Sequence, residues 1–306
     1  MARVLVTGAN GQLGRRLIGA LPPEVAIQAV VRSVRAQQMV ARHVGARPGL
    51  IVTVADPGDV DALGRLGSGC EAAVHLIGAI KESRENPYAD SHTRPAQALS
   101  EAARSAGVRH IVYLSILGAD LHSACRCLRE RARVEDILLR AAPVASVIRV
   151  PMVLGEGDRA SGALARRALQ NHVFLLRAKS LEQPIYAGDV ITAVMNALRM
   201  NDPVNRTYEL AGPESLPRRA LVARAAAVMN RQPSIHSLPL AFGMAAAAIL
   251  ALVNTRPPIT PDMLRVLDHD DAIDPAPAAA ALDIALTPLD SMLERSIRHR
   301  IAQATI

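Results

Sequence analysis

The 306-residue sequence predicts an α/β protein with a doubly wound parallel sheet, followed by a smaller, mainly helical C-terminal lobe. In the first half, short apolar runs rich in Val and Ile alternate with longer Ala-, Leu- and Arg-rich stretches, which is the pattern of βα units. Beyond residue 151 this rhythm breaks, and prolines recur at 257–261 and 275–277. We therefore expect one domain over 1–151 and a smaller lobe over 152–306, of which about 183–200 returns to the first domain's core.

Six apolar runs are the expected strands of the sheet. They are residues 3–7, 26–32, 50–54, 72–77, 110–115 and 145–150. A shorter strand-like run follows at 184–187, and an apolar, Ala-rich helix is expected over 238–253. That helix is shorter than the roughly 20 residues needed to cross a bilayer, so we expect it to be buried or to lie against a membrane surface or a protein partner.

Composition and charge narrow the classes of function. The net charge is +7 and is carried almost entirely by arginine, which favours anionic ligands or surfaces. Because the arginines are scattered and only 2% of residues are aromatic, we expect no nucleic-acid partner. Three cysteines without a paired framework indicate a reducing compartment, so a cytoplasmic protein, at most peripheral to the inner membrane, is expected. The histidines and cysteines form no metal-ligand pattern, and no metal is expected.

A glycine-rich turn directly follows the first expected strand and opens a helix. Gly8 permits a tight turn, Gly11 lets backbone amides approach a pyrophosphate, and Gly14 lets the helix pack closely on the sheet. The helix N-terminus adds N–H groups and the positive end of a dipole. This context predicts a Rossmann-type dinucleotide site. Its expected residues are Thr7, Gly8, Asn10, Gly11, Gln12, Leu13 and Gly14.

The end of the second strand indicates which dinucleotide binds. NAD-preferring proteins usually place an acidic residue there, whereas this sequence has Arg32. A guanidinium group can pair with a 2′-phosphate, supported by Arg35 or Arg15, so NADP(H) is favoured over NAD(H). A solvated surface arginine is the alternative.

Residues after the third and fourth strands extend the expected cofactor site. Asp56 is expected either to contact the adenine or to cap the helix that begins near Asp59. Gly78 lies where the backbone would run close to the cofactor. His75, within the fourth strand, is expected to be a core histidine.

The Gly-x-x-Gly-x-x-Gly spacing after Thr7 resembles the short-chain dehydrogenase/reductase superfamily, particularly its extended and atypical branches. Further segments occur in the order typical of one atypical family, which includes the nucleotide-binding accessory subunit of mitochondrial complex I and bacterial epimerase/dehydratase-like relatives. These segments are residues 74–78, 106–115, 148–151, 183–190 and 208–213. The resemblance implies an extended Rossmann fold with bound NADP(H) and adds Pro151 to the cofactor site. Asp189, in the fourth segment, is expected to cap a following helix.

The superfamily's usual catalytic residues are altered in this chain. The Tyr-x-x-x-Lys pair falls on Cys127 and Arg131, in a helix expected over 127–139, while the serine of the fifth strand is present as Ser115. Cysteine lacks the reach of a phenol, although neighbouring arginines could lower its pKa. Arg131 can bind ribose or phosphate but cannot act as a titrating ammonium group.

Two hypotheses about function follow. The first is an NAD(P)-binding homologue without Tyr/Lys-type catalysis, serving structure, assembly or redox sensing, with the dinucleotide and a protein complex or a membrane surface at 238–253 as partners. The alternative is an active NADPH-dependent reductase or epimerase/dehydratase that acts on a small apolar substrate. Its proton donor would be Cys127, Tyr88 or His92.

Overall fold

A seven-stranded sheet with the strand order β11-β6-β5-β4-β1-β2-β3 organises the first of two units in this computed structural model. The structure describes residues 1–78, 88–141, 143–253, 264–265 and 269–304. The first unit consists of Met1–Arg149 and Ile191–Tyr208. Its strands are β1 (Arg3–Thr7), β2 (Ala26–Val31), β3 (Leu50–Val54), β4 (Ala72–His75), β5 (His110–Ile116), β6 (Ala145–Val150) and β11 (Arg206–Glu209).

The sheet confirms the predicted doubly wound α/β class. The strand pairs β1–β2, β2–β3, β1–β4 and β4–β5 are all parallel. From β1 the chain first adds β2 and β3 on one side and then crosses to add β4, β5 and β6 on the other side. The position between β1 and β4 is therefore the topological switch point, where open α/β sheets bind their ligands. This position lies at the carboxyl ends of the strands, where the predicted glycine turn follows β1.

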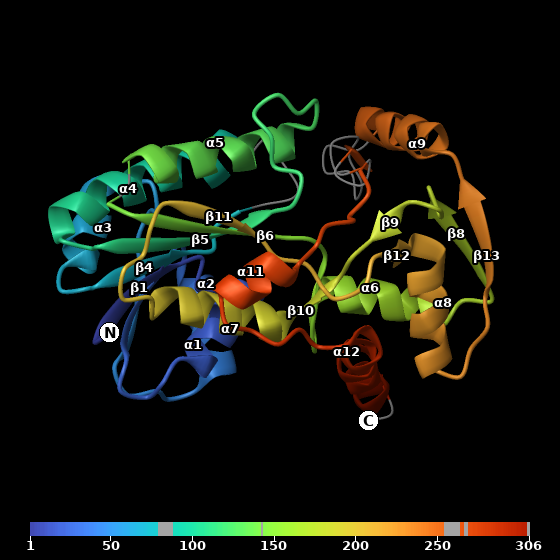
Figure 1. Ribbon diagram of the computed structural model, residues 1–306, viewed down its shortest axis with the longest axis horizontal. Coiled ribbons are helices and arrows are strands. Elements are labelled where there is room, and N and C mark those ends of the chain that lie inside the picture. Colours follow the sequence, from blue (N-terminus) through green and yellow to red (C-terminus); the bar gives the residue numbers. More distant parts are fainter. Residues whose placement is uncertain (79–87, 142, 254–263, 266–268, 305–306) are drawn as a thin grey trace. The chain divides into compact units, whose positions relative to one another are not determined.

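Helices cover both faces of the sheet (Figure 1). On one face lie α3 (Val60–Gly67), α4 (Arg94–Ala106) and α5 (Arg126–Ala141), and on the other lie α1 (Gln12–Ala20) and α2 (Val34–Val44). A π-helical turn, η1 (Ala89–Thr93), precedes α4, and α7 (Ala187–Leu198) carries the chain from the second unit back to the first. A cluster of buried apolar side chains packs under α3, α4 and α5. They include Leu5, Leu63, Leu99, Ile111, Val134 and Leu138.

The second unit, Val150–Val190 and Glu209–Ile306, combines small sheets with helices. Its strand pairs are β7 (Val153–Leu154) with β10 (Ile185–Tyr186), β9 (Leu181–Glu182) with β12 (Leu216–Pro217), and β8 (His172–Leu176) with β13 (Ser234–Leu238). Its helices are α6 (Arg159–Ala168), α8 (Arg218–Val228), α9 (Leu240–Val253), α11 (Ala276–Ala281) and α12 (Leu289–Ala304). A core between α6, α8 and α12 holds Leu164, Leu221 and Leu293.

Several predicted element bounds were wrong. The strand predicted over 72–77 ends at His75, because the next residues run past the glycine turn instead of continuing the ladder. The strand β11 was missed, since only Tyr208 of its four residues is buried. The apolar helix begins at Leu240 rather than 238, because Leu238 still pairs with β8. Within the described residues, no helix has the length and apolarity to span a bilayer.

The expected capping role of Asp189 was also wrong. The helix α7 begins at Ala187, so Asp189 lies inside its first turn. Its carboxylate accepts hydrogen bonds from the backbone N–H of Thr287 at 2.8 Å and from the Thr287 hydroxyl at 2.7 Å. The side chain therefore anchors the segment that leads into α12.

Candidate functional site

The glycine turn after β1 packs against the backbone that follows β4. Gly8 has a φ of +75°, and a Cβ on it would lie 2.7 Å from the carbonyl carbon of Leu76. A Cβ on Gly14 would lie 2.5 Å from the carbonyl oxygen of Gly8. Any side chain at these two positions would therefore displace backbone, which explains why the sequence needs glycine at both.

The helix that follows this turn presents an open N-terminus. Gly11 is the N-cap of α1 and has no side chain that could accept a hydrogen bond from the first turn, and that turn holds no acidic residue. The N–H groups of the first turn, Gln12 to Gly14, carry the positive end of the helix dipole. Together with a backbone that no Cβ crowds, this arrangement fits the pyrophosphate of a dinucleotide.

Basic side chains lie at the ends of the neighbouring strands. Arg32 directly follows β2 and is exposed, and Arg35 lies exposed in the first turn of α2. Burial, together with repulsion from Arg16, lowers the pKa of Arg15 on α1. No acidic residue lies in the first turn of α2, whose N-cap is Ser33. This edge of the sheet is therefore basic, with the guanidinium groups of Arg32 and Arg35 both exposed.

The carboxylate of Asp56 is engaged within the first unit. Its oxygens accept hydrogen bonds from Arg94 at 2.9 and 3.1 Å and from the Gly58 N–H at 2.9 Å. The bond from Arg94 holds the Asp56 pKa below its ordinary value. Asp59, not Asp56, caps α3, so the capping alternative for Asp56 was wrong. A contact with adenine stays a prediction.

Two residues of β5 face one stripe of α5. Tyr113 and Ser115 share a face of the strand because side chains alternate, and Arg131 and Glu135 share a face of the helix because they are four residues apart. Arg131 donates hydrogen bonds of 3.1 Å to the Tyr113 hydroxyl and to the Leu114 carbonyl. Burial raises the pKa of the Tyr113 hydroxyl, which therefore stays neutral.

Arg131 also reaches the end of β4. A Cβ on Gly78 would collide with the Arg131 guanidinium group. The structure thus brings together two predicted site residues, Gly78 and Arg131, and holds the arginine between the ends of β4 and β5. The Nε atom of Arg131 is buried and makes no hydrogen bond within the described residues.

Ser115 is part of a buried ionic network. Its hydroxyl donates a 2.5 Å hydrogen bond to Glu135, whose carboxylate also accepts three hydrogen bonds from Arg149, between 2.6 and 3.1 Å. The Ser115 side chain is buried, as is the Glu135 carboxylate. The hydroxyl that the resemblance assigns to chemistry is therefore engaged in holding β5, α5 and β6 together.

The remaining candidates for proton transfer are buried. Cys127 has no exposed surface, and Tyr88 and His92 pack edge to face with ring centroids 5.4 Å apart at 1% and 0% exposure. His75 is fully buried, as predicted, and its Nδ1 atom lies 2.8 Å from the Thr7 hydroxyl. Burial and the positive charge of Arg131 lower the pKa of His75 to about 3. Pro151 directly follows β6 and is buried.

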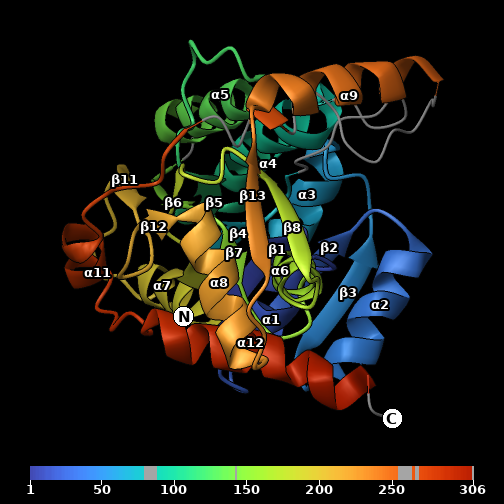
Figure 2. The same cartoon turned by 90° about the vertical axis from the view of Figure 1, so that its right-hand side faces the viewer.

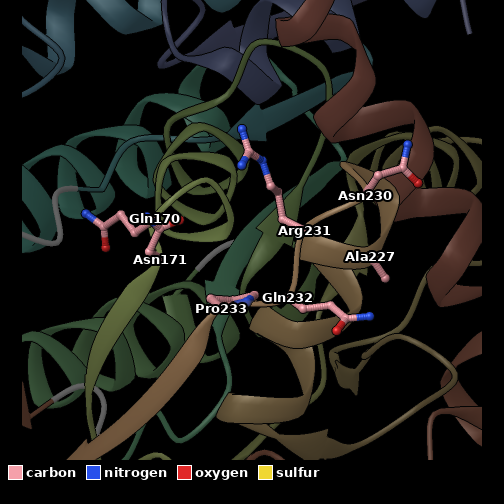
Figure 3. Close-up of a pocket in the computed structure, with 7 residues that line it drawn as sticks. All are labelled: Gln170, Asn171, Ala227, Asn230, Arg231, Gln232 and Pro233. Atoms are coloured by element: carbon pink, nitrogen blue, oxygen red, sulfur yellow. The ribbon is translucent and has the colours of Figure 1, made fainter.

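Neither of two surface hollows is lined by residues of the glycine turn. One, of about 310 Å³, is lined by Asp120, Glu135, Asp136 and Arg149 among others. A larger one of about 600 Å³ lies in the second unit between the ends of α6 and α8 (Figure 3). The polar ends of its Gln170, Asn230 and Gln232 side chains point away from one another rather than toward a common centre. Among the described residues, no three His, Cys, Asp or Glu side chains are grouped to hold a metal.

Sequence reasoning missed the partners of the predicted residues. The roles of Tyr113 and Arg149 were not foreseen, although the sequence carried a signal. Tyr113 and Ser115 are two residues apart and so share one face of a strand, and Arg131 and Glu135 are four residues apart and so share one face of a helix. Two such pairs are expected to meet where the helix packs on the strand.

Comparisons with known proteins agree with this geometry. Residues 8–144 match the model of an NAD(P)H-binding family. NADH dehydrogenase [ubiquinone] 1 alpha subcomplex subunit 9 of Mus musculus is 27% identical, covering 96% of this chain and 80% of its own length. Its Arabidopsis thaliana counterpart is 28% identical over 79% of this chain. The match covers only 62% of that relative's own length. Ceramide reductase of Caulobacter vibrioides is 29% identical over 88% of this chain and 84% of its own length.

A solved structure supports the fold. The NADPH-dependent quinone oxidoreductase QOR2 of Escherichia coli, complexed with NADPH, superposes with a TM-score of 0.73 at 20% identity. The match covers 95% of this chain and 98% of that one. Taken together with the glycine turn and the strand order, these similarities show an NAD(P)H-binding fold in which residues 8–144 match an NAD(P)H-binding family, and the chain as a whole is similar to atypical short-chain dehydrogenase/reductase proteins.

Proposed function

We propose that this protein binds NADP(H) as a structural or regulatory nucleotide and does not use the Tyr/Lys-type chemistry of its superfamily. The observation that carries the proposal is the Ser115 hydroxyl, which donates to the buried Glu135–Arg149 pair. A hydroxyl fixed in this way is not presented to a substrate. The complete burial of Cys127 at the usual tyrosine position supports the same conclusion.

In this proposal the first unit's residues hold the nucleotide. The N–H groups of Gln12, Leu13 and Gly14 bind the pyrophosphate, and Arg32 pairs with the 2′-phosphate, supported by Arg15 or Arg35. Arg131, held by Tyr113 and Leu114, would bind the ribose as a fixed positive charge. A bound NADP(H) would supply a hydride donor or acceptor, and this chain's residues would orient it and exclude water.

Relatives named as subunits of NADH dehydrogenase support a role within a protein assembly. A bound nucleotide stabilises a folded unit by an amount that rises with the logarithm of its concentration divided by its Kd, because it binds the native state alone. Loss or oxidation of the nucleotide would then alter the stability of the unit and the assembly that depends on it.

A reductase is the second candidate, and the relative named ceramide reductase favours it. Such an activity needs a proton donor that reaches a substrate. Because Tyr88, His92 and Cys127 are all buried, this candidate requires the site to open before reaction.

Calorimetric titration with NADPH and NADH tests the cofactor assignment. We expect NADPH to bind more tightly, and Arg32→Ala to weaken NADPH binding by roughly tenfold or more, since a charge-assisted hydrogen bond contributes about 1.5–3 kcal/mol. NADH binding should barely change. Arg42→Ala is the matched control, because Arg42 is exposed in the last turn of α2, the helix that begins two residues after Arg32. Equal affinities of the parent protein for the two nucleotides would refute the NADP(H) assignment.

A further inference from the structure

The second unit carries an exposed apolar face on β8, β13 and α9. The sequence contains only two phenylalanines, Phe174 on β8 and Phe242 on α9, and they are 62% and 69% exposed. Leu238 and Leu250 are also exposed. Since large apolar side chains are normally buried, we define these four residues as the apolar face.

These elements adjoin one another on one side of the unit. β8 and β13 are paired strands (Figure 2). Phe174 stacks on its partner His236 with ring centroids 5.0 Å apart. By strand alternation, Phe174, Leu176 and Leu238 project from the same face of this pair. A Cβ on Gly243 would lie 2.5 Å from the Leu176 side chain, so the start of α9 packs on that same face.

The stretches of chain that carry the apolar face are rich in basic residues. Residues 159–181 and 215–253, which contain β8, β13 and α9, hold nine Lys or Arg and no Asp or Glu. Three of these nine pair with acidic residues from outside the two stretches: Arg177 with Asp270, Arg218 with Glu182 and Arg224 with Glu214. Lys179 is exposed and lies two residues after Arg177, whose backbone N–H donates to the Leu238 carbonyl at 3.0 Å. Such a surface is complementary to an apolar layer that is covered by anionic groups.

We propose that the apolar face docks onto the surface of an anionic lipid bilayer. Phe174 and Phe242 enter the boundary between headgroups and acyl chains, and Lys179 pairs with anionic headgroups. The 14 residues of α9 include no charged side chain, and the helix lies in the plane of the membrane rather than across it. The docking is independent of the nucleotide, which the first unit binds.

Flotation with phosphatidylcholine vesicles, with and without phosphatidylglycerol, tests this docking. We expect the protein to float with the anionic vesicles and to be released by high salt, which screens the attraction of Lys179. Each of Phe174→Ser and Phe242→Ser should lower the partition about tenfold, and Lys179→Gln about fivefold. Val204→Ser is the matched control: Val204 is 57% exposed but lies in the first unit, and its loss should leave partition unchanged.

Three results would overturn the proposal. The protein could fail to float with either vesicle, or float equally well with both. Alternatively, size-exclusion chromatography with light scattering could show a dimer that Phe174→Ser and Phe242→Ser dissolve, without any vesicle binding, which would make the apolar face an interface between copies. NADPH affinity, measured on the same variants, should be unchanged, and this readout separates failure of docking from failure of nucleotide binding.

Discussion

Substituting Arg149 tests whether Ser115 and Glu135 have a structural role. The Glu135 side chain is 5% exposed, and Arg149→Met would leave its carboxylate with the Ser115 hydrogen bond but without its cation. Removing one partner of a buried ion pair costs about 3–5 kcal/mol. Because the Arg149 side chain is 23% exposed, solvent already screens part of its attraction to Glu135, and the substitution removes less. We therefore expect the lower end, a decrease of about 3 kcal/mol in the free energy of unfolding.

Urea unfolding followed by circular dichroism measures this change. The matched control is Arg140→Met, which breaks a 2.6 Å pair with Asp136 on the same helix. There the arginine and aspartate side chains are 78% and 38% exposed, so the cost should be below about 1 kcal/mol. The double variant Glu135→Gln/Arg149→Met should be less destabilised than the sum of its single variants, because the two residues are coupled. Equal effects of Arg149→Met and Arg140→Met would refute the assignment of a buried structural network.

Three further predictions concern the glycine turn, the cysteines and the histidines. Gly14→Ala should abolish NADPH binding in calorimetry, because its Cβ would meet the Gly8 carbonyl. Gly19→Ala is the control: Gly19 has open space around it on the same helix, so this variant should keep binding and gain about 1 kcal/mol of stability. Equal binding by both variants would contradict the role of the turn. The three cysteines are buried, so a maleimide should label none of them before urea unfolds the chain, and rapid labelling of the native protein would contradict this. Burial lowers the pKa of His75 to about 3 and that of His110 to about 4, so only the unfolded state gains these protons as the pH falls below about 6.5. As the pH falls below about 6.5, the free energy of unfolding should therefore decrease by up to about 1.4 kcal/mol per pH unit for each histidine. Equal free energies of unfolding at about pH 7 and about pH 5 would contradict this prediction.

The sheet and the glycine turn could be predicted because their signals are local. An apolar run followed by Gly8, Gly11 and Gly14 specifies a strand, a turn and a helix start within twelve residues of chain. The same reasoning placed His75 in the core, since it lies within an apolar strand. β11 escaped prediction because a four-residue edge strand with one buried side chain has too little pattern to be recognised.

The partners of polar residues could not be predicted, because they come from distant parts of the chain. Asp56 and Asp189 both precede or begin helices, where a cap is the usual local interpretation. In the structure Asp56 holds Arg94, and Asp189 holds Thr287, 98 residues away. Likewise, the altered superfamily positions were visible in the sequence, but only the fold shows that Ser115 is bonded to Glu135.

Mass spectrometry of the purified protein, combined with a turnover assay on the same sample, tests the central claim most directly. We expect the protein to carry NADP(H) and the nicotinamide absorbance to stay constant when carbonyl and quinone compounds are added. Oxidation of NADPH by the parent protein that disappears in Cys127→Ala or Ser115→Ala would contradict the claim, as would a protein that binds neither NADP(H) nor NAD(H).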